Sequence, residues 1–335
     1  MIRSVLSFAF SGFVALSLSC AHAGDSHEEG DEDGHSKFEF ALIGDTPYRD
    51  IAQFENVLSA INANPNIKFV LHAGDIKTGS SACSNELFAD RLERFNRFEV
   101  PFVITPGDNE WTDCHRVAAG QYQPLERLAK LRQVFYPVPG QTLGRKTLKV
   151  ETQATDPLRA EFVEHVRWTR QYVTFAALHV VGSHNGLDRF EKKSAAKRTP
   201  ADDAEVARRI AASVAWIRST FAQAKAEESR GVLFLFQANP NFPAAPGSAH
   251  RKGFDQVLAV LQKEVIAFGK PVMLAHGDSH YMRVDKPLRI SGTAIPNLTR
   301  VETFGDSDYH WLRVVVDPDS REVFSVHQEI VGGNR

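Results

Sequence analysis

Phe69-Val-Leu-His-Ala-Gly74-Asp75 is a short apolar run that ends in Gly-Asp, and the chain contains three more runs of this kind. They are Phe40-Ala-Leu-Ile-Gly44-Asp45, Phe102-Val-Ile-Thr-Pro-Gly107-Asp108 and Val272-Met-Leu-Ala-His-Gly277-Asp278. Each run is rich in apolar residues and is bounded by a turn residue, a pattern typical of buried strands. Because glycine allows a sharp turn, we expect each aspartate just beyond the carboxyl end of its strand.

These four aspartates together predict a metal site. In open α/β sheets, ligands bind at the carboxyl ends of the strands. Carboxylates gathered there repel one another unless a positive charge lies between them, and one or two hard divalent cations would supply it. A Gly-Asp pair can instead mark a strand-to-helix turn with Asp as the N-cap. Four copies, two of them extended by Asn109-Glu110 and Ser279-His280, favour the metal site.

The pattern of strands and helices changes after Asp278. Before it, strands alternate with helical patterns, and two successive β-α-β steps predict an α/β fold with a parallel sheet. Further helices are expected at residues 125–135, 201–228 and 254–268. After Asp278, three strand-like runs follow one another, which favours a second, mixed or antiparallel sheet packed against the first. The polar residues 141–170 are expected to be a hairpin-like insertion that covers part of the site.

The first residues predict a secretory signal peptide, residues 1–23. Arg3 supplies a positive start, an apolar core follows, and Ala21-His22-Ala23 is a small-x-small cleavage site. We expect cleavage after Ala23 and a periplasmic or secreted mature protein. A lipoprotein anchored through Cys20 is the alternative, but the aliphatic residue usual three positions before the cysteine is missing.

Composition places limits on the rest of the chain. Residues 24–37 are acidic and His-rich and are expected to form a disordered leader, followed by a single domain at residues 38–331. The formal charge of −2 gives no basic field for nucleic acid. The apolar core of the leader is too short for a good membrane span, so we expect no transmembrane segment in the mature chain.

Two cysteines, Cys83 and Cys114, remain once the leader is removed. An exported chain with two cysteines is expected to pair them. Both follow Gly-Asp runs closely in the sequence, so the bridge would brace two loops of the predicted site. Two unpaired thiols are the alternative.

The order of these motifs resembles that of the calcineurin-like metallophosphoesterases, over roughly residues 38–330. That resemblance implies two mostly mixed β-sheets packed face to face and flanked by helices, a four-layer sandwich, with two metal ions at strand ends. It also implies hydrolysis of a phosphoester.

Carried over position by position, the resemblance implies a metal-ligand set. Its members are Asp45, Asp75, which would bridge both metals, Asp108, Asp278, His280, Gln237 and Asn239. Several positions depart from the family pattern. Pro47 stands where a histidine ligand is usual, and Ala238 falls at the lone histidine position. The set that remains is rich in oxygen, which suits Mn²⁺, Mg²⁺, Fe or Ca²⁺ better than a tetrahedral Zn²⁺ site.

The catalytic residues also differ from the family pattern. Asn109 replaces the histidine credited with assisting catalysis, and an amide cannot protonate a leaving group, although it can hydrogen-bond a phosphoryl oxygen. The candidate acids are His184, His276, His72 and Glu110. For His72 and His276 a hydrogen-bonded core histidine is the alternative, and Glu110 can equally be a partner of the ligands. Two cations on the loops, Lys77 and Arg116, are predicted phosphate contacts.

The sequence therefore predicts an exported metal-dependent phosphoesterase that hydrolyses a phosphate mono- or diester by metal-activated water. The alternative is a catalytically weakened or inactive relative that binds a phosphorylated or anionic ligand through a retained metal site. A structural Ca²⁺-binding domain would explain the carboxylates but not their position at strand ends.

Overall fold

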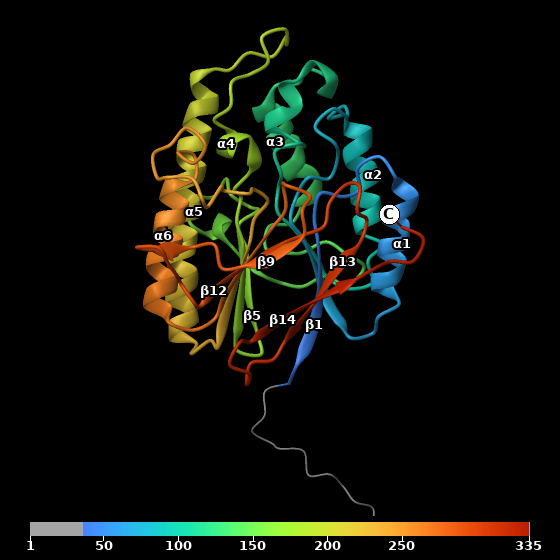
Figure 1. Ribbon diagram of the computed structural model, residues 1–335. Helices are drawn as coiled ribbons and strands as arrows, with labels where there is room; N and C mark the ends of the chain where they lie inside the picture. Colours follow the sequence, from blue (N-terminus) through green and yellow to red (C-terminus); the bar gives the residue numbers. More distant parts are fainter. Residues whose placement is uncertain (1–35, 335) are drawn as a thin grey trace, which may run out of the picture. The chain divides into compact units, whose positions relative to one another are not determined.

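Two β-sheets pack face to face in the computed structural model, which describes residues 36–334 (Figure 1). The predicted signal peptide and nearly all of the acidic leader lie outside the described residues. The first sheet has the order β14-β13-β1-β2-β3. Its strands are β1 (Phe38–Ile43), β2 (Ile67–His72), β3 (Phe102–Ile104), β13 (Trp311–Val316) and β14 (Phe324–Glu329). The three strands from the N-terminal half are parallel, and β13 pairs antiparallel with β1.

The second sheet has the order β4-β5-β6-β7-β8-β12-β9. Its strands are β4 (Glu151–Thr152), β5 (Val166–Arg170), β6 (Val173–Ala177), β7 (Gly231–Leu235), β8 (Val272–His276), β9 (Arg283–Asp285) and β12 (Leu298–Glu302). Strands β6, β7, β8 and β12 are parallel, β5 and β9 run antiparallel to them, and β4 pairs antiparallel with β5 at the edge. A separate two-stranded ribbon joins β10 (Arg289–Ile290) to β11 (Thr293–Ala294).

Helices cover the outer face of each sheet, as expected for parallel strands joined by crossovers. The first sheet is covered by α1 (Ile51–Asn62), α2 (Asn85–Phe95) and α3 (Pro124–Phe135), and the second by α5 (Pro200–Ala226) and α6 (Asp255–Phe268). The remaining helical elements are short: α4 (Gly182–Gly186) and the 3₁₀ turns η1 (Thr112–His115), η2 (Val117–Ala119) and η3 (Gln153–Thr155). The four-layer sandwich implied by the family resemblance is confirmed.

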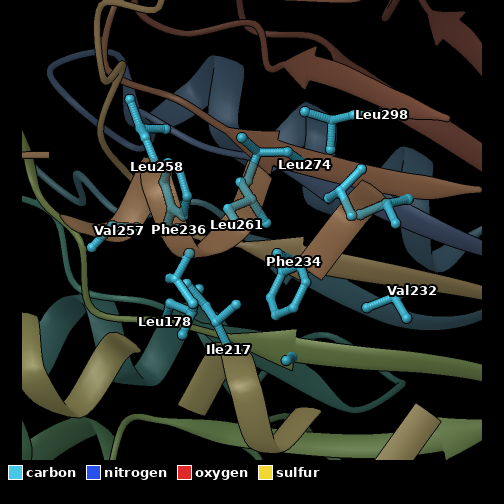
Figure 2. Packing of buried hydrophobic residues seen from close by; sticks show 14 of the residues in the cluster. Leu178, Ile217, Val232, Phe234, Phe236, Val257, Leu258, Leu261, Leu274 and Leu298 are labelled. Carbon is cyan, nitrogen blue, oxygen red and sulfur yellow. The ribbon is translucent and has the colours of Figure 1, made fainter. Parts of the chain in front are cut away.

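Alternation along the strands produces three apolar layers. Phe40 of β1 points between the sheets and stacks on Phe69, whereas its neighbour Ala41 faces the helices. The layer between the second sheet and its helices is built around Phe234 of β7 and Ile217 of α5 (Figure 2). Each large apolar side chain buried in this way contributes roughly 1.5–3 kcal/mol.

Two expectations about how segments of the chain join the sheets are wrong. The last strand-like runs do not form a sheet of their own, because β12 joins the second sheet while β13 and β14 extend the first. The segment 141–170 does not cover the site either. Its strands β4 and β5 pair with each other and with β6 at the edge of the second sheet. The first placement is decided by pairing of β13 with β1 far along the chain, which local pattern does not contain, whereas β4 and β5 pair with their neighbours in the sequence.

Candidate metal centre

The four Gly-Asp turns follow β1, β2, β3 and β8, and they meet where the carboxyl ends of these strands face one another across the two sheets. Oxygen atoms of Asp75, Asp108 and Asp278 all lie within 4.8 Å of one another, and the three residues form a possible metal site. Asp45 lies beside them, because the backbone N–H of Asp278 donates to its Oδ1 at 3.0 Å.

The glycines of the motif allow these close approaches. A Cβ on Gly107 would lie 2.0 Å from Oδ1 of Asp75, and a Cβ on Gly277 would lie 2.2 Å from Oδ2 of Asp45. Any side chain at either position would displace a carboxylate. The Gly-Asp pairing seen in the sequence is thus a packing requirement of the carboxylate cluster.

The backbone at the cluster is strained. Asp45, Asp75, Asp278 and His280 all adopt left-handed conformations, with φ between 51° and 83°. Such residues cost roughly 1–3 kcal/mol each and persist where the surrounding structure over-determines them, often at functional sites.

Asp75 is at the centre of a hydrogen-bond network made of neutral donors. Asn109 donates to it twice, from its backbone N–H to Oδ1 at 3.1 Å and from Nδ2 to Oδ2 at 2.9 Å. The amide of Gln237 and the hydroxyl of Tyr48 also donate to Oδ2, each at 3.2 Å. None of these donors carries a positive charge.

Electrostatics at the cluster fit a divalent cation. Burial, followed by the neighbouring aspartates, raises the pKa of Asp45 and of Asp75 well above the usual carboxyl range, and burial raises the pKa of Asp278 to about 7. Among the described residues, no Lys or Arg forms an ion pair with these aspartates or with Asp108. Oδ1 of Asp108 is buried and accepts no hydrogen bond from any residue that the structure describes. Buried carboxylates without an ion-paired Lys or Arg are the donor set that a hard cation would complete.

The ring orientation of His280 also suits a metal ligand. Its Nδ1 lies 2.5 Å from the carbonyl oxygen of Asp306, which can only accept, so Nδ1 carries the proton. The lone pair is then on Nε2, which lies 3.2 Å from the hydroxyl of Tyr48 and 3.5 Å from Oδ1 of Asp45. A carbonyl that fixes the tautomer in this way is the usual partner of a metal-binding histidine.

The two predicted amide ligands have other partners. Gln237 uses both ends of its amide, since Nε2 donates to Asp75 and Oε1 accepts from the N–H of Gly182 at 2.6 Å. The side chain of Asn239 donates to Ser279 at 2.6 Å, and its backbone N–H donates to Asp278. In this arrangement both residues position the cluster and leave no amide oxygen directed at a cation.

Three predicted catalytic or phosphate-binding residues are buried away from solvent. Lys77 is fully buried and donates to the carbonyl oxygens of Thr78 and Asn109, so it is not placed to contact a phosphate. Glu110 accepts backbone N–H groups from two Gly-Asp loops, and burial raises its pKa to about 7. His276 is buried within β8, where burial lowers its pKa to about 3. These placements correct the roles expected for Lys77 and His276, because sequence alone gives no depth of burial.

His72 is buried as well, with burial lowering its pKa to about 4, and it contacts the carbonyl of Thr46 at 2.6 Å. The alternative of a hydrogen-bonded core histidine describes it. His184 differs, because it is partly exposed and pairs with Asp188.

A cleft of about 1240 Å³ opens beside the cluster. Tyr48 and Asp113 connect it to the carboxylates, and Arg116 and His184 line its wall. Among the described residues, three other cations of this wall make no side-chain hydrogen bond or ion pair: Arg49, Arg189 and Lys252. The cleft therefore places three cations without an ion pair among the described residues next to the carboxylate cluster, in a wall that also contains Asp113, Asp188, Glu191 and Asp306.

Three residues of the site escaped the sequence analysis. The hydroxyl of Tyr48 bridges Asp75 and His280. The sequence hint for this role is that Tyr48 follows Pro47, the position at which the family usually has a histidine ligand. Ser183 donates towards Asp108 and Asp113, each at 2.8 Å. No local pattern marks Ser183 or Asp113 as site residues. Ser183 follows β6 of the second sheet and Asp113 follows β3 of the first, so their side chains meet only in the packed fold.

The predicted disulfide is present between Cys83 and Cys114, with Cα atoms 5.8 Å apart. Both sulfur atoms lie near the carbonyl oxygen of Asn109, at 3.5 and 3.7 Å. The bridge therefore braces the loop that presents Asp108 and Asn109 to the cluster.

The two packed sheets and the acidic centre at their strand ends define a metallophosphoesterase architecture. The chain belongs to the calcineurin-like phosphoesterase family, whose sequence model matches residues 18–282. A solved structure described as GAP50, the anchor in the inner membrane complex of Plasmodium, is similar over 89% of this chain and 90% of that chain, with 9% identity and a TM-score of 0.45. A comparison with curated proteins found no match.

Proposed function

We propose that this chain is an exported metal-dependent phosphoesterase that hydrolyses a phosphate mono- or diester with metal-activated water. The observation that carries the proposal is the buried cluster of Asp75, Asp108 and Asp278 at the strand ends, with which no described Lys or Arg forms an ion pair. Membership of a family that normally uses divalent metals and acts on phosphoesters supports it.

The ligand assignment follows from the geometry of the cluster. Asp75, Asp108 and Asp278 would hold one ion, and Asp45 and His280 would hold a second together with Asp75. Oxygen ligands dominate both sets, which favours Mn²⁺, Mg²⁺, Fe or Ca²⁺ over Zn²⁺. When bound, such ions lower the pKa of a water molecule and offset charge on phosphoryl oxygens.

The protein's own groups would bind and orient the ester. Arg116 lines the cleft and is held by Asp113 at 2.6 Å, so its guanidinium is available at a fixed place for phosphoryl oxygens. The hydroxyl of Tyr48 faces the same cleft beside His280. Arg49, Arg189 and Lys252 line the same cleft without an ion pair among the described residues and can contact further anionic groups of a substrate.

Export is supported by two features. The chain begins with a signal-peptide pattern, and the structure contains a disulfide, which persists in oxidising compartments. None of the helices that the structure describes is both long and apolar enough to span a bilayer.

One observation favours the second candidate, a relative that binds an anionic phosphoester without hydrolysing it. The Nδ2 of Asn109 donates to Asp75 and to Tyr48, both at 2.9 Å, so the group in the place of the usual histidine serves the cluster. An amide supplies no proton to a leaving alcohol.

Turnover distinguishes the two candidates. The purified mature chain is assayed with 4-nitrophenyl phosphate and bis(4-nitrophenyl) phosphate in the presence of Mn²⁺, beside Asp75→Asn and the matched surface variant Asp156→Asn. We expect turnover in the native chain and in Asp156→Asn and none above background in Asp75→Asn. Metal binding without turnover of either ester would instead support the binding protein.

A further inference from the structure

The turn α4, Gly182–Gly186, is the most unusual backbone near the cluster. Ser183, His184 and Asn185 are three consecutive residues in the left-handed region, with φ of 48°, 55° and 58°. Residues other than glycine rarely adopt this backbone conformation even singly, so three in a row need strong support from their surroundings.

The turn packs directly against the carboxylate cluster. A Cβ on Gly182 would lie 2.8 Å from the carboxylate of Asp108, so the backbone itself forms the wall on that side. The N–H of Gly182 holds Gln237, which in turn donates to Asp75. Ser183 donates towards Asp108 at 2.8 Å. The left-handed turn thus fixes two of the three carboxylates of the possible metal site.

Arg209 of α5 supports this turn from the opposite side. Its guanidinium is fully buried and donates from Nη2 to the carbonyl oxygen of Asn185 at 2.9 Å and from Nη1 to the Asn185 side-chain oxygen. Glu205, one helical turn earlier, accepts from Nε at 2.8 Å and balances the charge. The guanidinium also lies over the ring of Trp111 at 5.3 Å.

We infer that Arg209 is a positioning residue for the metal centre: it holds the left-handed turn in place, and the turn holds Asp108 and Gln237. Arg209 contacts none of the predicted ligands, so its effect on the site passes through Asn185, Gly182 and Ser183. The planar guanidinium of Arg209 has several fixed N–H donors, so it can bind Asn185 and Glu205 at the same time. A lysine ammonium is a compact point charge and cannot reproduce this geometry. The inference rests on the proposed metal site and adds a residue that the family motifs do not contain.

The test compares Arg209→Lys with Arg132→Lys in the full mature chain. Arg132 is also a helix arginine paired with a fully buried glutamate, Glu164, at 2.6 Å, but it touches no residue of the turn. Isothermal titration with Mn²⁺ gives the affinity, thermal unfolding gives the stability, and hydrogen exchange reports on amides 182–186. We expect both variants to lose stability, but only Arg209→Lys to bind Mn²⁺ at least about tenfold more weakly and to exchange faster at these amides.

Unchanged Mn²⁺ affinity and unchanged exchange in a folded Arg209→Lys would overturn the inference and leave Arg209 a purely structural residue. If that variant does not fold, Asn185→Gly decides. Glycine accepts the left-handed backbone and keeps the carbonyl that Arg209 binds, but it removes the side-chain amide, which accepts from Arg209 and Val181 and donates to Gly253. Mn²⁺ binding should therefore weaken by a few fold, together with some loss of stability. Equal affinity in Asn185→Gly would contradict the inference. Absence of Mn²⁺ binding by the native chain would refute the proposed function. In that case hydrogen exchange at amides 182–186 would be the remaining test of whether Arg209 holds the turn.

Discussion

Asp75 and Glu164 are both fully buried acids, yet the protein treats their charges in opposite ways. Burial raises the pKa of Asp75 well above its usual range, and the nearby acids add to the effect. Burial would do the same to Glu164, but the charge of Arg132 and a hydrogen bond from His179 outweigh it and hold the pKa of Glu164 well below its usual range. The first of these acids has no ion-paired Lys or Arg among the described residues, whereas the second has Arg132.

This difference separates a structural ion network from a binding site. The network around Glu164 is closed, because every charge in it has a partner within the chain. The hydrogen bonds to Asp75 come from neutral donors, and no described Lys or Arg forms an ion pair with the cluster, so a cation would supply the missing partner. Substitution of an acid by its amide should therefore have opposite effects on stability in the two regions.

The largest expected effect is at Glu164. Glu164→Gln leaves the guanidinium of Arg132 without its buried partner, and the loss of one member of a buried pair typically costs about 3–5 kcal/mol. Urea unfolding of the metal-free protein measures it. The control is Glu161→Gln, whose carboxylate is part-exposed and 3.9 Å from Arg132, and which should cost less than about 1 kcal/mol. Equal losses in the two variants would show that burial does not separate these pairs.

Asp278→Asn makes the same chemical change in the carboxylate cluster. Its amide oxygen can still accept from the N–H of Asn239, but one negative charge is gone. We expect Mn²⁺ to bind more weakly by at least the roughly 10–100-fold typical of a lost supporting partner. Without metal, the variant should be more stable than the native chain by on the order of 1 kcal/mol at pH 8, because it no longer has to ionise a buried acid. A metal-free variant less stable than the native chain would break the comparison.

The pH dependence follows from the same raised pKa values. In the metal-free fold Asp278 titrates at about 7, above its value in the unfolded chain. Between these two values the native state binds more protons than the unfolded state, so stability falls as pH rises from about 5 to 8. Metal must displace those protons, and Mn²⁺ should bind roughly tenfold more tightly at pH 6 than at pH 5, both below this pKa, if one proton leaves. Titration calorimetry at both pH values checks the slope, and affinity independent of pH would mean that the cluster is ionised before metal arrives.

The sequence predicted the parts of the molecule that depend on local pattern. The Gly-Asp runs located four strands and their aspartates, because each run carries both a strand pattern and its turn. It did not predict Ser183 or Tyr48, which reach the cluster through contacts between the sheets, nor the burial of Lys77. It also misplaced β13 and β14, since the choice of sheet depends on pairing with β1, some 270 residues earlier. Patterns within about ten residues are visible in one sequence, whereas the depth at which a side chain is buried and the strand with which another strand pairs are properties of the assembled fold.

The smallest expected effect concerns Asn109, whose side chain now serves Asp75 rather than a leaving group. If the native chain hydrolyses esters without an acid at this position, its rate should depend steeply on leaving-group pKa and favour nitrophenyl over alkyl phosphates. In Asn109→His the ring would lie beside Gly79, a residue of the cleft that has no side chain. We expect a gain of up to about tenfold on alkyl esters and a shallower dependence in this variant, below the 10²–10⁴-fold of a well-placed acid. Asn109→Gln is the control that keeps an amide and should show no gain. A shallow dependence in the native chain would mean that another group, His184 or Tyr48 at the cleft, already supplies the proton.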